Sequence, residues 1–353
     1  MNTFYIAISL LSLSFIFSMI IVSTMSLHEN ITSDDINGVQ KFHKSKTPRI
    51  GGIALAFAFL TGFLFIDNDI FNLWTILGIS SIPCFFGGLF EDLFKNASTK
   101  IRISLTFLSG IVFVILSKYS INSIDVYGID YLLSFFLISL FFTSFAIAGI
   151  SNAINIIDGF NGLASGSVLI MIIGIAYISY KVSDYELLKI CIFISAIILG
   201  FMLMNFPFGK IFLGDSGAYY LGFLLSCILV MAPYRNPEIS PWTCLLICMY
   251  PFFETIFSIL RKTKRTGHNF DRPDRLHLHM LIYRDVSRKI SKKLKIENYR
   301  NSITSLILWP GALLPVLISV FFYNNETVIF VSIIIFMLCY LLLYRKLSLN
   351  ELW

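Results

Sequence analysis

Four carboxylates stand where apolar segments of this 353-residue chain begin or end, and carboxylates that converge can hold a metal ion. Glu91 and Asp92 follow one apolar segment, Asp158 follows another and Asp215 precedes a third. Because no thiolate accompanies them, their oxygen atoms would suit a hard cation such as Mg²⁺. Mg²⁺ usually takes one or two protein carboxylates and completes its shell with water and substrate phosphates. The sequence therefore predicts a magnesium site that binds a phosphorylated substrate.

Amide and basic side chains occupy similar segments and could bind the rest of that substrate. Asn152 and Asn155 precede Asp158 at intervals of three residues, so a helix would turn all three toward one sector. Donors for phosphate oxygens are supplied by Lys44, Lys46, Arg49, Lys95, Lys210, Arg272, Arg275, His277 and His279. A metal, carboxylates and a basic ring together describe a phosphoryl-transfer site.

Each of these residues also has a structural explanation. Lys and Arg gather on the cytosolic side of membrane proteins whatever the function. Asp92 or Asp215 could cap a helix, and Asn152 and Asn155 could hydrogen-bond to a neighbouring helix. The confinement of the whole set to one face is what favours chemistry.

The elements that must position these residues are membrane-spanning helices. Charged residues make up 14% of the chain and hydrophobic residues 56%, whereas soluble domains carry about 25% charged residues. A single soluble domain, a disulfide-rich secreted scaffold and a disordered chain are thereby excluded. The fold prediction is an all-α integral membrane protein with about eleven transmembrane helices in one domain over 1–353. The apolar stretches are 3–25, 50–66, 70–90, 103–117, 131–150, 162–180, 190–205, 216–233, 239–260, 302–323 and 327–344.

The basic residues orient this bundle. When the loops are assigned alternately to the two sides, all but four of the 27 Lys and Arg residues fall on one side. Basic loops face the cytosol, so we expect an extracytoplasmic N-terminus, a cytoplasmic C-terminus and a long basic cytoplasmic loop at 261–301. All the candidate site residues lie on that side. A transporter would be expected to place its polar groups near the membrane midplane.

Two features remain apart from this site. The six cysteines lie in apolar runs, which favours small buried apolar side chains over disulfides or zinc ligands. Glu254 lies inside the ninth apolar stretch, where a charge costs about 2.5–3.5 kcal/mol. We therefore expect Glu254 to be paired, functional or protonated.

Several segments resemble the polyprenyl-phosphate N-acetylhexosamine-1-phosphate transferases, which form glycosyltransferase family 4. The strongest are 152–163, with its Asn-x-x-Asn-x-x-Asp-Gly-x-Asn-Gly-Leu pattern, and 212–217, with Phe-Leu-Gly-Asp-Ser-Gly. Segment 47–52 and the pair at 91–92 support them, so the resemblance extends from residue 41 to about 283. The expected topology of this family also has eleven spans.

The resemblance implies roles for individual residues. Asp215 matches a Mg²⁺ ligand, with Asp92 beside it, and Glu91 with Asp92 matches a pair that engages the lipid phosphate and the metal. His277 and His279 match a His-rich loop over the sugar-phosphate end. The implied catalytic residues are Glu91, Asp92 and Asp158; the implied substrate-binding residues are Lys44, Arg49, Asn152, Asn155, Asn161, Lys210, His277 and His279; the implied metal ligands are Asp215 and Asp92.

Three departures from the family pattern bear on the branch. Glu91 replaces the first Asp of the pair and keeps a carboxylate, whereas Asn161 replaces an Asp found in many members and loses a charge. Met280 replaces the last His of a His-x-His-His pattern, which argues against the peptidoglycan type. The resemblance therefore favours the branch that initiates O-antigen or enterobacterial common antigen.

The implied reaction transfers N-acetylhexosamine-1-phosphate from a UDP-sugar to undecaprenyl phosphate and releases UMP. Its cofactor would be Mg²⁺, with Mn²⁺ as an alternative, and its partners the two substrates and membrane lipid, without nucleic acid. A homodimer stays open. The protein would lie in a bacterial inner membrane with its active site on the cytoplasmic face. The rival hypothesis is a transporter or flippase that binds polyprenyl phosphate without chemistry.

Overall fold

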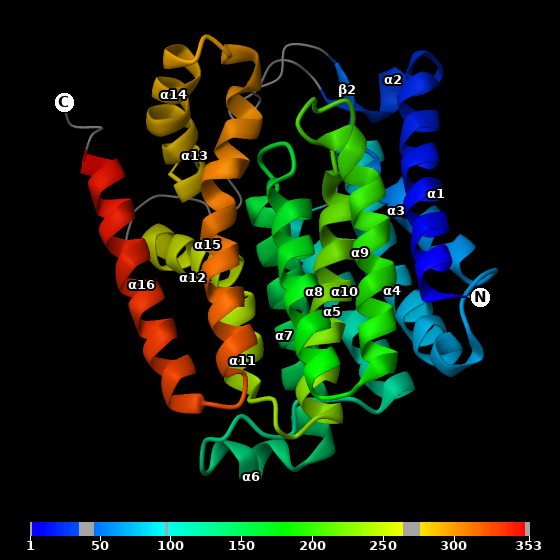
Figure 1. Cartoon of the computed structure of the whole chain (residues 1–353), viewed down its shortest axis with the longest axis vertical. Helices are drawn as coiled ribbons and strands as arrows, with labels where there is room; N and C mark the ends of the chain where they lie inside the picture. The colour runs from blue at the N-terminus through cyan, green and yellow to red at the C-terminus, as the bar shows by residue number, and fades with distance from the viewer. Residues whose placement is uncertain (1, 35–45, 96–97, 264–275, 350–353) are drawn as a thin grey trace.

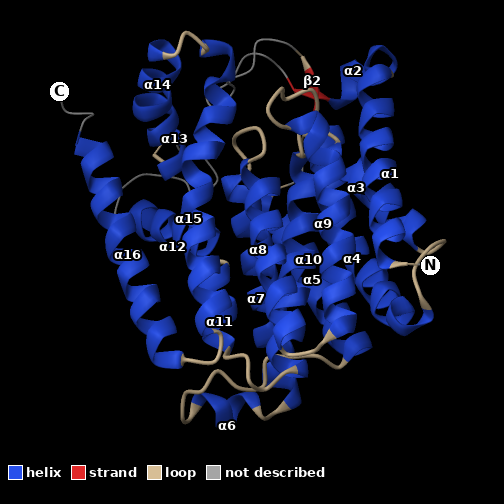
Figure 2. Ribbon diagram, in the orientation of Figure 1, coloured by secondary structure: helices blue, strands red, loops and turns tan. Residues whose placement is uncertain are grey.

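A computed structural model shows an almost entirely helical chain, described over residues 2–34, 46–95, 98–263 and 276–349. Figure 2 shows that the described residues are mostly helical, with one short antiparallel pair of strands, β1 and β2. The elements are α1 (Thr3–Ser23), α2 (Met25–Thr32), β1 (Ser33–Asp34), β2 (Thr47–Pro48), α3 (Gly51–Gly62), α4 (Asn68–Phe94), α5 (Thr99–Ser117), α6 (Ile129–Leu133), α7 (Phe136–Ile157), α8 (Leu163–Lys181), α9 (Tyr185–Asn205), α10 (Gly214–Arg235), α11 (Pro241–Ile247), α12 (Met249–Thr263), α13 (Leu278–Ile282), a π-helix (Tyr283–Ser287), α14 (Arg288–Lys293), a 3₁₀-helix (Glu297–Tyr299), α15 (Arg300–Phe322) and α16 (Glu326–Leu349). The predicted all-α fold is confirmed.

Each of the eleven apolar stretches forms a helix, but two depart from a simple span. Within the described residues, nine helices are long and apolar enough to cross a membrane. The stretch 239–260 is broken into α11 and α12, which meet at an angle of 77°. The stretch 50–66 yields only the 12 residues of α3, a rise of about 18 Å. Both departures lie next to residues of the candidate site, described below.

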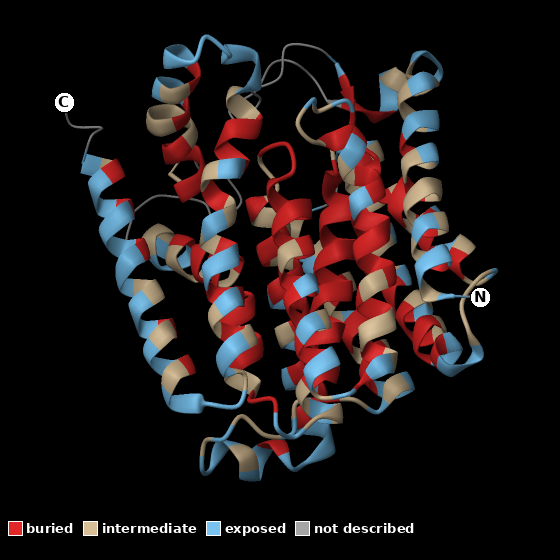
Figure 3. Ribbon diagram, viewed as in Figure 1, coloured by how far each residue is buried: buried red, intermediate tan, exposed pale blue. Residues whose placement is uncertain are grey.

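One helix forms the centre of the bundle. Of an 18-residue stretch of α10, 94% is buried, against 17% for α16 and 22% for α1. Figure 3 shows this contrast, with α10 and its neighbours buried and the two outer helices largely exposed. α10 packs against α4, α7, α8, α3 and α5. Apolar side chains exposed on the outer helices, such as Leu342 and Phe321, fit a lipid environment, in which helices satisfy their own backbone hydrogen bonds.

The loops fall into two groups at opposite ends of the bundle (Figure 1). One end carries β2, the segments that follow α7 and α9, and the π-helix with α14. The other end carries α6 and the turn between α15 and α16. The described parts of the basic-side segments, among them 46–50, 158–162, 205–213 and 283–300, lie at the first end, which we call the site end; the other is the far end.

Candidate active site

Asp92 lies near the last turn of α4 and caps the start of α10. Its Oδ1 accepts a hydrogen bond from the backbone N–H of Asp215 (2.8 Å), and its Oδ2 accepts from the N–H (2.8 Å) and hydroxyl (2.6 Å) of Ser216. The Asp92 side chain is fully buried. These bonds satisfy N–H groups that a helix leaves unpaired at its start. The structural explanation raised for Asp92, that it caps a helix, therefore holds: Asp92 lies on α4 and caps α10.

Glycines allow the three helices at this junction to approach so closely. A methyl group at Gly52 would collide with the backbone of Ser216 and Gly217, and one at Gly88 with the backbone of Asp215. Gly214 has φ +74°, and a methyl group there would collide with Asp92. The backbone N–H groups of Gly51 and Gly52, at the start of α3, also donate hydrogen bonds of 3.0 Å to carbonyl groups in the segment before α10. The ends of α3, α4 and α10 thus form one rigid unit around the carboxylates.

Two guanidinium groups converge on Asp215. Arg49, just before α3, pairs with Asp215 and lies 3.5 Å from Asp92 Oδ1 through its Nε. Arg102, near the start of α5, pairs with the other oxygen of Asp215 and lies 6.0 Å from the ring of Tyr219. The Asp215 side chain is 6% exposed. Positive charge is therefore concentrated where the sequence predicts a metal and phosphates.

Asp158 belongs to the same electrostatic cluster. It lies just beyond the end of α7 and is half-buried. Burial raises the pKa of Asp158 to about 7; the positive charge of Arg49 opposes this rise, and the negative charge of Asp92 adds to it. Asp92 and Asp215 are thus joined directly, and Asp158 is close enough for the charges of Arg49 and Asp92 to act on it. Glu91 precedes Asp92 on α4 and is half-buried.

The asparagines of α7 face different surroundings. Asn152 accepts a hydrogen bond from the hydroxyl of Tyr219 on α10 (3.0 Å), which matches the structural explanation of a bond between helices. Asn155 is half-buried one turn before Asp158, and its backbone carbonyl accepts the N–H of that residue. Tyr219 is 1% exposed. Asn152 therefore positions α7 against the central helix next to the site.

Asn161 and Lys210 lie in two loops that are fastened together at the site end. The Asn161 amide donates to the carbonyl of Pro207 (3.4 Å), and its backbone N–H donates to Asn301 (2.6 Å). Lys210 is exposed, with its ammonium 5.7 Å from the ring of Phe208. Asn205 joins the same loops through hydrogen bonds of 2.7 Å to Gly162 and Ile211. Asn161 holds the loop that follows Asp158, while Lys210 remains accessible.

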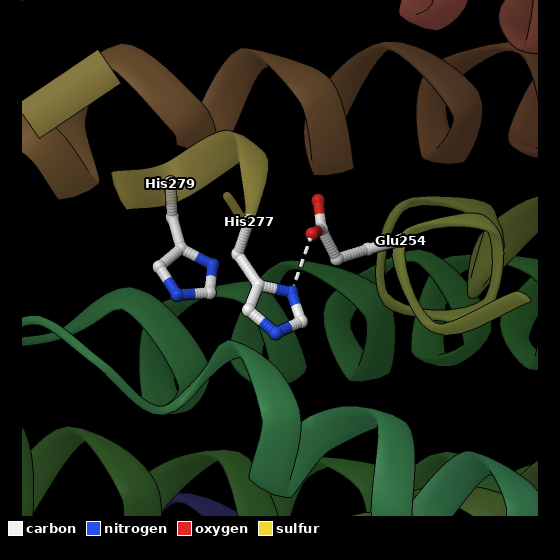
Figure 4. A group of neighbouring side chains, drawn as sticks. All are labelled: Glu254, His277 and His279. Atoms are coloured by element: carbon white, nitrogen blue, oxygen red, sulfur yellow. Dashed lines mark hydrogen bonds and ion pairs between the residues drawn. The ribbon is translucent and has the colours of Figure 1, made fainter. Parts of the chain in front are cut away.

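His277 and His279 lie beside the loop that carries Asp158. The two rings are parallel, with centroids 5.2 Å apart, and the ring of His279 meets that of Phe160 edge to face. A methyl group at Gly159 would lie 3.3 Å from Nε2 of His279. Figure 4 shows both histidines with Glu254, whose Oε1 lies 2.8 Å from His277 Nδ1. Glu254 is thus a paired residue, one of the interpretations open from sequence.

Some predicted residues cannot be placed, and some observed ones were not predicted. Lys44, Arg272 and Arg275 lie outside the described residues. Sequence reasoning did not single out Arg102, Ser216 or Tyr219, all of which contact the predicted residues. Arg102 gave a signal only as one of many basic loop residues, and Ser216 only as part of the 212–217 segment. The six cysteines are free, as expected, and five of them are buried.

The donor set at this junction fits Mg²⁺. Asp215, Asp158 and Asp92 offer hard carboxylate oxygens, which Mg²⁺ prefers, and no thiolate lies among them. Asp92 already accepts three hydrogen bonds and both oxygens of Asp215 are paired with guanidinium groups, so Asp215 would bind a cation as those groups turn away from it. The two guanidinium groups on Asp215 would instead be available to phosphate oxygens.

Comparison with known proteins places the chain in a family. The family model described as glycosyl transferase family 4 matches residues 74–233. The phospho-N-acetylmuramoyl-pentapeptide-transferase of Streptococcus pyogenes serotype M6 is 30% identical over 283 residues, covering 73% of this chain and 80% of that protein. The chain belongs to glycosyl transferase family 4, as its segments predicted.

Other relatives carry the same name. The phospho-N-acetylmuramoyl-pentapeptide-transferases of Streptococcus uberis and Streptococcus agalactiae serotype Ia are 28% and 27% identical, with the same coverage. The matched family region contains Asp92, Asp158 and Asp215 but ends before Glu254 and the histidines. The family match therefore coincides with the carboxylate junction of this family 4 chain.

Proposed function

We propose that this protein transfers an N-acetylhexosamine-1-phosphate group from a UDP-sugar to undecaprenyl phosphate and releases UMP. The observation that carries the proposal is the junction at the start of α10, where Asp92, Asp158 and Asp215 meet Arg49 and Arg102. Carboxylates and guanidinium groups at one end of a membrane bundle suit a reaction between a lipid phosphate and a soluble diphosphate. Family membership supports the same chemistry.

In this reaction an oxygen of the lipid phosphate attacks the phosphorus that bears the sugar. The bond from that phosphorus to the oxygen bridging to UMP breaks, so one phosphoanhydride replaces another. The barrier is mainly electrostatic because both reactants are anions. Arg49 and Arg102 would lower it by binding phosphate oxygens, and Glu91 would orient the lipid phosphate or accept its proton. Asp158, with its raised pKa, is a second group that can hold a proton near the reacting phosphates.

A divalent ion would add to this charge neutralisation. Asp215, with Asp92 beside it, would hold Mg²⁺, which supplies a positive charge to the diphosphate and to the departing UMP. Asp92 also fixes the start of α10, so the carboxylate of Asp215 is held in place by the same bonds that cap the helix. Mn²⁺ would serve as a substitute.

We propose that the remaining predicted residues contact the substrates. Lys210 is exposed at the site end and would bind phosphate, while Asn155 borders the same space. Asn152 and Asn161 would shape the nucleotide-sugar site from the two segments that flank Asp158. The histidines would cover the sugar-phosphate end. The basic loops support a cytoplasmic site end and an extracytoplasmic N-terminus in a bacterial inner membrane.

Two hexosamine classes compete as the donor. The departure at Met280 favours a simple UDP-N-acetylhexosamine, as used to begin an O-antigen-like polysaccharide. The relatives of about 30% identity favour a donor that carries N-acetylmuramoyl-pentapeptide. A flippase without chemistry would leave either donor intact.

The test measures UMP release by the purified protein with undecaprenyl phosphate and Mg²⁺. Donors are UDP-GlcNAc, UDP-GalNAc, UDP-QuiNAc, UDP-FucNAc and UDP-MurNAc-pentapeptide, assayed separately. We expect one of the simple hexosamines to be used, with turnover abolished by EDTA and restored by Mg²⁺ or Mn²⁺. Asp215→Asn should reduce turnover by about 10³-fold or more. The matched control is Asp69→Asn, which alters an exposed ion pair at the other end of the bundle.

Two outcomes would decide against parts of this proposal. If UDP-MurNAc-pentapeptide were the one donor that supports turnover, the protein would belong to the peptidoglycan branch of the family. Lipid binding without UMP release from any donor would favour the flippase. Wild-type turnover in Asp215→Asn would show that the reaction takes place elsewhere in the protein.

A further inference from the structure

Glu254 is a buried carboxylate whose partners come from the start of α13 and from α16. It lies on α12 and is 1% exposed. Its Oε1 lies 2.8 Å from His277 Nδ1 and accepts the backbone N–H of Leu278 (3.2 Å), and its Oε2 accepts the hydroxyl of Tyr340 on α16 (2.6 Å). A buried ionisable residue in a membrane bundle is expected to have a function. The partners of Glu254 indicate what that function is.

The geometry of this cluster is that of a hydrogen-bonded pair. Glu254, His277 and His279 have ligand atoms within 4.8 Å of one another, and two histidines with a glutamate are a known zinc set. Ligands about 2.0–2.1 Å from a tetrahedral zinc ion lie about 3.3 Å apart. The 2.8 Å between Glu254 Oε1 and His277 Nδ1 is instead a hydrogen-bond distance. Three donors already occupy the carboxylate.

We propose that Glu254 is a positioning residue that fixes the tautomer of His277. An ionised carboxylate can only accept hydrogen bonds. The 2.8 Å contact between Glu254 Oε1 and His277 Nδ1 therefore requires the proton to be on Nδ1. Nε2 of His277 is then left as the nitrogen that can accept or carry a second proton. Figure 4 shows Nδ1 directed at Glu254 and the other ring nitrogen directed away from it. The catalytic meaning of this arrangement rests on the proposed function.

The break between α11 and α12 explains how a carboxylate reaches this place. A bend of 77° turns α12 away from the direction of α11. Glu254 thereby lies beside α13 and contacts the residue before it, His277, as well as the first residue, Leu278. Tyr340 holds the second oxygen from α16. The carboxylate is thus fixed from both sides and can fix the imidazole ring in turn.

The second histidine has a different environment. His279 is 1% exposed, and its Nδ1 is buried without a hydrogen-bond partner among the described residues. Burial lowers the pKa of His279 to about 3, and the neighbouring His277 adds to this shift. His279 is therefore a neutral ring that packs against Gly159 and Phe160. Of the two, His277 is the one that is hydrogen-bonded to the carboxylate of Glu254.

A carboxylate–imidazole pair beside the Asp158 loop would serve the proposed reaction in a specific way. His277 Nε2 would exchange a hydrogen bond or a proton with the sugar-phosphate group as charge moves onto the departing UMP. Glu254 touches neither substrate. Its effect would be exerted through the ring that it orients.

The test is Glu254→Gln, read by two independent measurements. The Gln amide can donate to His277 Nδ1, which would favour the opposite tautomer with the proton on Nε2. We expect ¹⁵N NMR of the histidine side chains, of which the chain has five, to show the Nδ1–H tautomer of His277 in the wild type and its loss in the variant. Turnover should fall by about 10²-fold or more, while KM for the UDP-sugar changes less than about threefold.

Two further variants keep the test decisive. Tyr340→Phe removes a hydrogen bond from the same carboxylate but leaves its contact with His277, so the tautomer should persist and turnover should stay within about threefold. Glu254→Asp keeps the charge, should keep the Nδ1–H tautomer and should retain more turnover than Glu254→Gln. If Glu254→Gln does not fold, Glu254→Asp can be used in its place to test the tautomer and the turnover.

An unchanged tautomer in Glu254→Gln would overturn the proposal, as would equal losses of turnover in Glu254→Gln and Tyr340→Phe. Zinc bound at one ion per chain in the wild type and lost in Glu254→Gln would replace the hydrogen-bonded pair by a metal site. The NMR measurement needs no turnover, so it remains informative even if no UDP-sugar is a substrate. Failure of the proposed function and failure of this inference can therefore be told apart.

Discussion

The two ends of the bundle each hold a cluster of charged residues, but only at the far end do the hydrogen-bond donors and acceptors satisfy one another. At the far end Arg235 donates to both oxygens of Asp184 (2.7 and 2.8 Å), to Glu186 (2.9 Å) and to the hydroxyl of Tyr119 (3.0 Å). Asp184 also caps α9 through the N–H of Leu187. This cluster lines an open cavity of about 560 Å³, yet its donors and acceptors are matched within the protein.

The cluster at the site end is not matched in this way. Two guanidinium groups share Asp215, while Asp158 has a raised pKa and Nε of Arg102 is buried without an acceptor among the described residues. Charges held without one-to-one partners cost stability, and such departures are expected at functional sites. The difference teaches that the far-end cluster holds the fold together, whereas the site-end cluster is prepared for ligands that bring their own charges.

The largest expected effect is on stability at the far end. Arg235→Gln should lower the free energy of unfolding by about 3 kcal/mol, because it leaves the buried carboxylate of Asp184 without its main partner. The apparent Tm in detergent, followed by intrinsic fluorescence, should fall by roughly 5–10 °C. Turnover measured well below that temperature should stay within about twofold. Lys189→Gln, which removes exposed ion pairs, is the control and should shift Tm only slightly.

The opposite outcome is expected for Arg49 at the site end. Arg49→Gln should reduce turnover by about 10²-fold, or about 2.7 kcal/mol of the activation barrier, because a donor for phosphate oxygens is lost. The apparent Tm should change less than in Arg235→Gln, since Arg102 still pairs with Asp215. Lys189→Gln, which removes exposed ion pairs at the far end, should keep full turnover. If Arg49→Gln and Arg235→Gln lost equal stability and equal turnover, the two ends would not differ in kind.

The smallest expected effect concerns pH and Asp158. Its pKa is about 7 in the folded protein against 3.8 in an ordinary environment, so the folded state binds a proton that the unfolded state releases between these values. Asp158 therefore contributes stability at low pH that is lost as the pH rises through about 7. Asp158→Asn removes this loss. Relative to the wild type, its free energy of unfolding should therefore rise by about 1 kcal/mol as the pH increases from 5 to 8.

The measurement is the apparent Tm of both proteins across that pH range without divalent ions. A gap that stays constant with pH would show that Asp158 is ionised throughout and would remove the asymmetry between the clusters. Divalent ions should reduce the pH dependence of the wild type, because a bound cation favours the ionised carboxylate.

Several features of the fold followed from pattern alone, and others depended on tertiary contacts. Each apolar stretch formed at least one helix, because a lipid environment forces backbone groups to pair within the segment. The 12-residue length of α3 could not be read from its composition, since the apolar run continues to residue 66 but the helix ends at Gly62, where the chain turns. The 77° bend between α11 and α12 was likewise not visible in the apolar pattern. Cys248, at that bend, gave no sequence signal.

The candidate site divides in the same way. Asp92, Asp158 and Asp215 were visible as carboxylates at the ends of apolar runs, and their convergence on one site stays a prediction. The structure joins Asp92 to the backbone of Asp215, and the charge of Asp92 acts on Asp158. The contribution of Arg102 was hidden among many basic residues, because the rule that places Lys and Arg in cytosolic loops does not say which of them turn inward. The sequence also did not show which residue pairs with Glu254, because its partner, His277, lies 23 residues further along the chain.

The sequence by itself determined that this is a many-helix membrane protein with a one-sided set of acidic, amide and basic residues, because lipid imposes length and polarity on each segment separately. Only the tertiary structure decided that Asp92 caps α10, that two arginines share Asp215 and that Glu254 holds His277. Such contacts join side chains from separate helices, and their geometry depends on how closely glycines let those helices approach.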